Sequence, residues 1–125
     1  MNIQESAEMY LEAILILSKE SGIVRSIDIV NHTGYSKPSI SRAVNLLKKH
    51  EYIDIDEKGH ISLKPEGLKI AEKIYHRHLT LTKILVSLGV DEETADQDAC
   101  RIEHVLSDES FEKIKEKFKD TIKEG

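Results

Sequence analysis

The chain has 125 residues, of which 39% are hydrophobic and 33% are charged, and its net charge is −5. This composition is typical of a soluble, helix-rich protein with one ordinary domain or two small ones. The longest apolar run, residues 11–17, is interrupted by Glu12 and is too short to span a membrane, and the sequence shows no secretory signal pattern. A single cysteine excludes an internal disulfide, so we expect a cytoplasmic protein.

Two helices are predicted before residue 35. Residues 6–19 are apolar on most sides and predict a buried helix, which Gly22 interrupts. Ser26 is a suitable N-cap for a short second helix, and Gly34 is suited to end it. The side chains of this second helix that we expect to face inward are Ile27, Ile29 and Val30.

The third predicted helix has two contrasting faces. Ser36 is its expected N-cap, and Pro38 falls in the first turn, where proline is favoured. Spacings of four and three predict a buried stripe of Ile40, Val44 and Leu47. The other face carries Lys37, Ser39, Ser41, Arg42, Asn45 and Lys48. Residues 24–50 hold five basic side chains and one acid, so a helix-turn-helix with a basic recognition helix is predicted.

Residues 52–63 predict a β-hairpin. Apolar residues alternate with acids from Tyr52 to Ile55, residues 57–60 form a turn with a glycine, and the alternation resumes at Ile61. Such a hairpin would be the wing of a winged helix, although small helical domains also carry hairpins that touch no DNA. With the basic helix, it favours double-stranded DNA as the ligand. The predicted DNA contacts are Ser26, Ser36, Lys37, Pro38, Ser39, Ser41, Arg42 and Lys48.

The second half of the chain predicts helices only. Pro65 and Gly67 mark the end of the wing, and we place the domain boundary between residues 63 and 64. The predicted helices run from Leu68 to about Leu88, from Glu92 to about Leu106, and from Asp108 to about Thr121. Three such helices supply little core of their own, so their apolar stripes are best buried against a second copy, as a homodimer. The predicted fold is mainly α, with a winged helix-turn-helix in residues 1–63 and a helical dimerisation domain in residues 64–125.

The segment ACRIEHVLSDE, residues 99–109, contains the single cysteine. On a helix, Cys100, Glu103 and His104 would share one face, where a thiolate, a carboxylate and an imidazole could bind a transition metal. The pattern alone also allows a buried cysteine beside an exposed ion pair. His78 lies in the apolar stripe of the preceding helix, and a lone histidine in such a stripe is usually a hydrogen-bonded core residue.

Four segments resemble the diphtheria toxin repressor family of metal-dependent repressors, which includes the iron-dependent and manganese transport regulators. They are AEMYLEAI at residues 7–14, SKPS at residues 36–39, YHRH at residues 75–78 and DACRIEHVLSDE at residues 98–109. The resemblance covers essentially the whole chain. It implies an N-terminal winged helix followed by a helical dimerisation domain, in the short form without the SH3-like domain that some members add.

Residue by residue, the resemblance implies that an activating metal is bound by Met9, Cys100, Glu103 and His104. His78 matches a ligand of a second, neighbouring metal, and Glu12 matches a ligand of manganese-type members. The chain departs from the iron-type pattern at Thr82 and Asp96, where that pattern has a glutamate and a histidine, and Asp98 is a further candidate ligand.

The implied function is a metal-activated repressor that binds a palindromic operator as a homodimer and controls divalent-metal homeostasis. Two sulfur donors, Met9 and Cys100, favour Fe(II) as co-repressor, with Mn(II) as the alternative. A small metallo-hydrolase would need an open coordination position and a general base in a closed pocket. Because the sequence has neither a nucleophile motif nor a glycine-rich phosphate loop, we expect no enzyme. A metal-independent winged-helix regulator would leave the cysteine segment unexplained.

Overall fold

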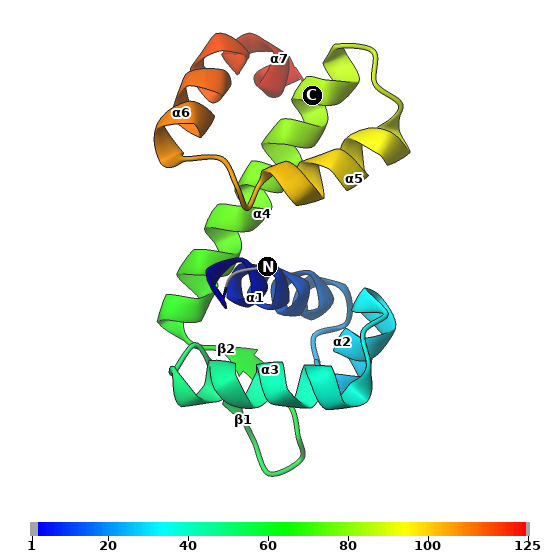
Figure 1. Ribbon diagram of the computed structural model, residues 1–125, viewed down its shortest axis with the longest axis vertical. Helices are drawn as coiled ribbons and strands as arrows, with labels where there is room; N and C mark the ends of the chain where they lie inside the picture. Colours follow the sequence, from blue (N-terminus) through cyan, green and yellow to red (C-terminus); the bar gives the residue numbers. More distant parts are fainter. Residues whose placement is uncertain (1–2, 125) are drawn as a thin grey trace. The chain divides into compact units, whose positions relative to one another are not determined.

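The computed structural model describes residues 3–124, and the side chains of residues 6–123 (Figure 1). Over that range the elements are α1 Ile3–Ser21, α2 Ser26–Thr33, α3 Lys37–Lys49, β1 Ile53–Ile55, β2 Ile61–Leu63, α4 Pro65–Ser87, α5 Glu92–Ile102, α6 Asp108–Lys117 and α7 Lys119–Glu124. They form two compact units, Met1–Glu72 and Lys73–Gly125. The predicted fold class, mainly helical with one hairpin, is confirmed.

The first unit is a helix-turn-helix followed by a hairpin. Helix α1 packs against α2, α3 and β2. Gly34 ends α2 in a left-handed conformation (φ 80°) and donates its N–H to the Val30 carbonyl, a turn that favours glycine. Ser36 caps α3 by accepting a hydrogen bond from the Ser39 N–H at 3.3 Å, as predicted. The largest fully buried side chains of this unit are Leu11, Ile14, Val24, Ile29, Ile40 and Ile53.

Two details of α2 differ from the prediction. The N-cap is Arg25, not Ser26, and its N–H donates to the Asp28 carboxylate at 2.9 Å. Val24 pairs with Ile61 of the hairpin, Arg25 is the last extended residue, and the helix begins at Ser26, one residue earlier than an N-cap at Ser26 would place it. Ile27 is exposed, because residues two apart on a helix point in nearly opposite directions and Ile29 occupies the core.

The predicted hairpin is confirmed. Strands β1 and β2 are antiparallel, with Ile53 opposite Leu63 and Ile55 opposite Ile61. The Asp56 carboxylate closes the turn by accepting the N–H groups of Lys58 and His60, each at 2.9 Å. These hydrogen bonds, the one from His60 first, lower the pKa of Asp56.

Gly67, in the first turn of α4, packs directly against the chain entering β1. A Cβ at this position would lie 2.1 Å from the Tyr52 carbonyl oxygen and 2.9 Å from its carbon. Both atoms are backbone, so the clash can be relieved only by moving α4 away from the hairpin. Gly67→Ala should lower the free energy of unfolding by about 2 kcal/mol, measured by urea denaturation. Gly59→Ala, which adds a Cβ in open space at a strained φ of 80°, is the control and should cost about 1 kcal/mol.

The second unit combines the later turns of α4 with α5, α6 and α7. Its core is Leu81, Ala99 and Phe111, with Ile102 and Leu106 packed against it. The predicted helix from Glu92 to Leu106 ends earlier, at Ile102, and the predicted last helix divides at Phe118, whose backbone leaves the helical region (φ −106°, ψ 18°). Among the described residues, no helix is both long and apolar enough to cross a membrane.

Candidate metal centre and nucleic-acid interface

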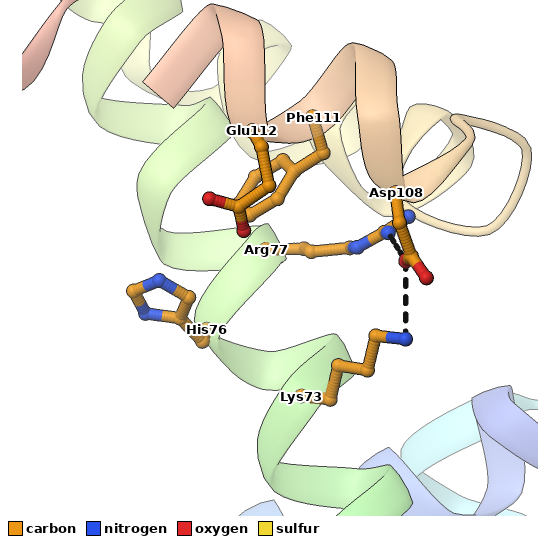
Figure 2. A pocket seen from close by; sticks show the side chains of 6 residues that line it. All are labelled: Lys73, His76, Arg77, Asp108, Phe111 and Glu112. Atoms are coloured by element: carbon orange, nitrogen blue, oxygen red, sulfur yellow. Dashed lines mark hydrogen bonds and ion pairs between the residues drawn. The ribbon is translucent and has the colours of Figure 1, made fainter. Parts of the chain in front are cut away.

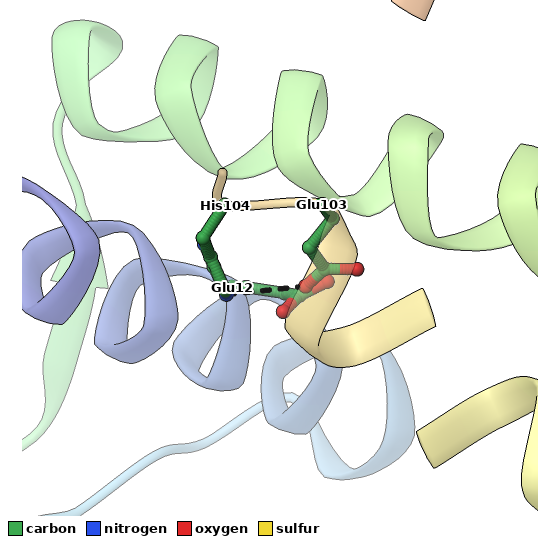
Figure 3. A group of neighbouring side chains, drawn as sticks. All are labelled: Glu12, Glu103 and His104. Atoms are coloured by element: carbon green, nitrogen blue, oxygen red, sulfur yellow. Dashed lines mark ion pairs between the residues drawn. The ribbon is translucent and has the colours of Figure 1, made fainter. Parts of the chain in front are cut away.

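A buried carboxylate lies between two imidazoles in the second unit. The side chain of Glu103 is fully buried at the C-cap of α5, and His104 follows it in the turn (Figure 3). One Glu103 oxygen lies 2.8 Å from His78 Nδ1, and the other lies 3.3 Å from His104 Nε2. An ionised carboxylate in such a place needs cationic partners or a metal, since burial alone would strongly disfavour its charge.

His78 is held at both ring nitrogens. While Nδ1 faces Glu103, Nε2 lies 2.7 Å from the Asp96 carboxylate. Asp96 is one of the two positions at which the chain departs from the iron-type pattern, and the structure brings it to the histidine that this pattern assigns to a second metal. At the other position, the Thr82 hydroxyl donates to the His78 carbonyl at 2.7 Å. Asp96 therefore contacts the His78 imidazole, whereas Thr82 bonds the His78 backbone.

The sequence predicts that Cys100 and His104 lie on one helix, but the structure does not place them on the same helix. Cys100 is exposed on α5, whereas His104 stands in the turn beyond the end of the helix. The alternative of a buried cysteine beside an exposed ion pair is wrong on both points, because the cysteine is exposed and Glu103 is buried. Asp98 is exposed on the same helix. A thiol, a carboxylate and two imidazoles within one unit are a donor set that fits a divalent transition metal.

Arg77 holds the turn that carries these groups, and sequence reasoning missed it. Its side chain, 6% exposed, donates to the carbonyls of Glu103 at 3.3 Å and Leu106 at 2.7 Å, and pairs with the Asp108 carboxylate. These bonds satisfy carbonyl groups of the turn between α5 and α6. The only sequence signal was a basic residue beside His78 in an otherwise apolar stripe.

A pocket of about 310 Å³ opens beside Arg77 (Figure 2). The Arg77 guanidinium lies 4.9 Å above the Phe111 ring, a cation–π contact. Lys73 Nζ lies 3.0 Å from the Asp108 carboxylate and, by this hydrogen bond, lowers the pKa of Asp108. The pocket is lined by Lys73, His76, Arg77, Asp108, Phe111 and Glu112. Both Lys73 and Arg77 pair with Asp108 at its edge, and Arg77 also bonds the turn after α5, so we assign the pocket a structural role in supporting that turn.

The first unit places the two predicted α1 ligands one turn apart. Met9 is half-buried and accepts a hydrogen bond on its sulfur from the Tyr35 hydroxyl at 3.7 Å. Glu12 is buried, 6% exposed. Residues three apart project from neighbouring positions on one helical face. A thioether and a carboxylate are thus presented by the same side of α1.

The predicted DNA contacts, except Ser26 at the start of α2, lie at the start and on the outer face of α3. Ser36, Lys37, Pro38, Ser41, Arg42 and Lys48 are exposed, whereas Ser26 and Ser39 are half-buried. Ser39 Oγ receives hydrogen bonds from the Ser36 hydroxyl at 2.9 Å and from the Arg42 guanidinium at 3.4 Å. The sequence did not reveal that Arg25 lies 3.0 Å from His60 Nε2, because 35 residues separate them.

Family models match nearly the whole chain. Residues 2–61 match the N-terminal DNA binding domain of the iron dependent repressors, and residues 64–121 match their metal binding and dimerisation domain. An HTH-type transcriptional regulator of Methanocaldococcus jannaschii is 33% identical over 125 residues, covering 96% of this chain and all of that protein. The regulator MntR of Bacillus subtilis is 35% identical, covering 87% of this chain and 77% of MntR.

Solved structures show the same fold. The manganese regulator SloR has a TM-score of 0.77 at 23% identity, covering 90% of this chain and 53% of SloR. IdeR of T. acidophilum has a TM-score of 0.76 at 23% identity, covering 94% of this chain and 54% of IdeR. The chain spans about half the length of these two proteins. The matched domains and the MntR relatives show that the chain belongs to the diphtheria toxin repressor family of metal-dependent transcriptional regulators.

Proposed function

We propose that this protein is a transcriptional repressor that binds operator DNA when Fe(II) is bound and thereby controls divalent-metal homeostasis in the cytoplasm. The observation that carries the proposal is the buried Glu103 between His78 and His104, in the segment that matches a metal-binding domain. The exposed basic start of α3, in the segment that matches a DNA-binding domain, supplies the surface for the operator.

The proposed activating site uses donors from both units. Met9, Cys100, Glu103 and His104 would surround one ion, as the family resemblance implies, and His78 and Glu12 would serve a second, neighbouring position. An ion that binds donors of both units would favour one arrangement of the recognition helix relative to the dimerisation helices. Metal and DNA would then strengthen each other's binding, with a coupling typically of about 1–3 kcal/mol.

The proposed DNA ligand is a palindromic operator bound by a homodimer. Two-fold symmetry would place one α3 helix in each half-site, with half-sites about 34–36 Å, or a multiple of that, apart. The basic and hydroxyl side chains at the start of α3 suit phosphate contacts and base-edge contacts in the major groove. Lys37 and Arg42 are the cations nearest that end of the helix.

Arg42→Ala should weaken operator binding without changing metal binding or folding. The Arg42 side chain is exposed and bonds only weakly within the protein, to Ser39 at 3.4 Å, so it is available for a guanine. Loss of such a contact typically costs about 1–3 kcal/mol of base discrimination. Fluorescence anisotropy at fixed salt measures the effect, with Lys19→Ala on α1 as the matched control. Equal operator affinity in Arg42→Ala and Lys19→Ala would move the DNA surface away from α3.

We choose Fe(II) over Mn(II) because the proposed ligands include the sulfur atoms of Met9 and Cys100. The structurally similar SloR is a manganese regulator. Met9→Asp replaces a soft, neutral donor with a hard anion of shorter reach, one turn from Glu12, and oxygen donors suit Mn(II). The variant should raise activation by Mn(II) relative to Fe(II), whatever it does to absolute affinity. The Mn(II) and Fe(II) concentrations that half-activate operator binding are measured anaerobically in wild type and variant, and their ratio is compared. A ratio that does not move would assign Met9 to packing.

The proposed function is tested by selecting double-stranded DNA from a random library with the full-length protein, in parallel with Fe(II), Mn(II), Zn(II) and a chelator under anaerobic conditions. The proposal predicts that one sequence is enriched only in metal-containing selections and most strongly with Fe(II). Enrichment of the same sequence in the chelator would identify a metal-independent regulator. Metal binding with no enriched sequence would leave DNA recognition without support and contradict the proposal.

A further inference from the structure

Tyr35 joins a proposed metal ligand to the start of the recognition helix within the first unit. Its hydroxyl donates to Met9 Sδ at 3.7 Å, across 26 residues of sequence. Its ring packs edge-to-face on Tyr10, with ring centres 6.2 Å apart. Burial, together with the neighbouring Tyr35, raises the pKa of Tyr10, so the Tyr10 ring stays neutral. The side chain of Tyr35 is therefore held against α1 at the residue that would bind metal.

The backbone of Tyr35 is held against α2. Its N–H donates to the Thr33 hydroxyl oxygen at 3.2 Å, and that hydroxyl donates in turn to the Ile29 carbonyl at 2.8 Å. Gly34, immediately before Tyr35, is fixed in the left-handed conformation that ends α2. The Tyr35 side chain, although 41% exposed, bonds Met9 on α1 while the Tyr35 backbone is bonded to α2, so Tyr35 links Met9 to the α2–α3 turn.

The residue after Tyr35 is the N-cap of α3. Ser36 accepts the Ser39 N–H at 3.3 Å and donates its hydroxyl to Ser39 Oγ at 2.9 Å. The same Ser39 oxygen receives a hydrogen bond from Arg42 at 3.4 Å. A continuous series of contacts therefore runs from the Met9 sulfur through Tyr35 and Ser36 to the side chains proposed to contact DNA.

We propose that Tyr35 is a positioning residue that couples metal binding at Met9 to the first turn of the recognition helix. The inference rests on the proposed function. A thioether sulfur has two lone pairs, so it can accept the hydroxyl and bind a metal together only if the hydroxyl approaches the remaining pair. Metal binding would therefore favour one orientation of the Tyr35 side chain, and with it one position of the Ser36 cap. By linkage, that position of the cap would favour metal binding equally.

The test is a double-mutant cycle in the full-length protein with Tyr35→Phe and Met9→Leu. Phenylalanine keeps the ring on Tyr10 and removes only the hydroxyl. The quantity measured is the factor by which saturating Fe(II) raises affinity for the selected operator. Tyr35→Phe should lower this factor about two- to fivefold, the effect of one modest hydrogen bond, and should have no further effect in the Met9→Leu background. Tyr52→Phe, the same chemical change at the start of the hairpin, should leave the factor unchanged.

A second measurement uses the metal-free protein. The chain has two methionines, Met1 and Met9, so labelling with ¹³C-methyl methionine gives two methyl resonances, and Met9→Leu assigns them. Tyr35→Phe should shift the Met9 resonance, whereas Tyr52→Phe should not. If the Met9 resonance does not shift in Tyr35→Phe, the hydrogen bond between the Tyr35 hydroxyl and the Met9 sulfur is absent in solution, and the inference is wrong.

The cycle separates this inference from the proposed function. Suppose that Fe(II) tightens operator binding by the same factor in the wild type and in Tyr35→Phe. This result would overturn the role of Tyr35 and leave the proposed function intact. An equal loss in the wild-type and Met9→Leu backgrounds would assign Tyr35 to packing and also overturn the inference. A wild type without any response to metal would overturn the proposed function itself, and the inference with it.

Discussion

His104→Ala should remain folded and lose about 100-fold or more in metal affinity, because loss of even an outer-shell partner typically costs 10- to 100-fold. The imidazole lies 3.3 Å from buried Glu103, and its removal leaves Glu103 paired with His78. Operator binding should therefore no longer respond to metal. Competition with a chelator measures metal affinity, circular dichroism measures folding, and anaerobic operator titrations measure the response.

His32→Ala is the matched control for this variant, since His32 is an exposed histidine in the last turn of α2. It should keep metal affinity and the metal response of the wild type. If His104→Ala unfolds while His32→Ala does not, His104 is a structural residue. If His104→Ala binds metal as the wild type does, the proposed ligand set is wrong at this position.

Arg77→Met should lower the free energy of unfolding by about 3 kcal/mol. The change keeps a long apolar side chain against Phe111 but removes the donors to the carbonyls of Glu103 and Leu106. Those carbonyls lie in the turn with the proposed ligands, so metal affinity should fall as well. Urea denaturation, followed by circular dichroism, measures the change in stability.

The matched control is Lys73→Met, which removes the other cation on the same carboxylate. Lys73 and Asp108 are largely exposed, with side-chain exposures of 60% and 72%, and exposed ion pairs contribute about 0–1 kcal/mol. Equal stability in the two variants would show that the buried guanidinium bonds do not hold the turn.

The parts of the fold that could be predicted from sequence are those determined locally. Helix α3 carries its own N-cap, Ser36, its own proline in the first turn, and a buried stripe with helical spacing. The start of α2 is determined elsewhere, since Arg25 stays extended because Val24 pairs with Ile61. The turn after α5 is likewise held by Arg77, whose partner Glu103 lies 26 residues further along the chain. Spacing within either helix contains no information about such partners.

The candidate site divides in the same way. Residue types at family-specific spacing predicted that Glu103 and His104 are neighbouring metal ligands. They also predicted that the start of α3 is basic and exposed. The acid that holds His78, Asp96, was recognised only as a departure from the iron-type pattern, because its contact depends on how α4 packs on α5. The Tyr35 hydroxyl on the Met9 sulfur was not predicted at all, since weak acceptors such as thioethers leave no pattern in sequence.

The proposed repressor requires metal binding and operator binding to be coupled in one protein. This coupling is measured by the Fe(II) dissociation constant of the full-length protein with and without saturating selected operator DNA, under anaerobic conditions. Linkage requires DNA to tighten metal binding by the same factor by which metal tightens DNA binding, and a coupling of about 1–3 kcal/mol corresponds to roughly 5- to 150-fold. We expect operator DNA to increase the Fe(II) affinity within that range. An Fe(II) affinity that is the same with and without DNA would show that the two ligands are not coupled.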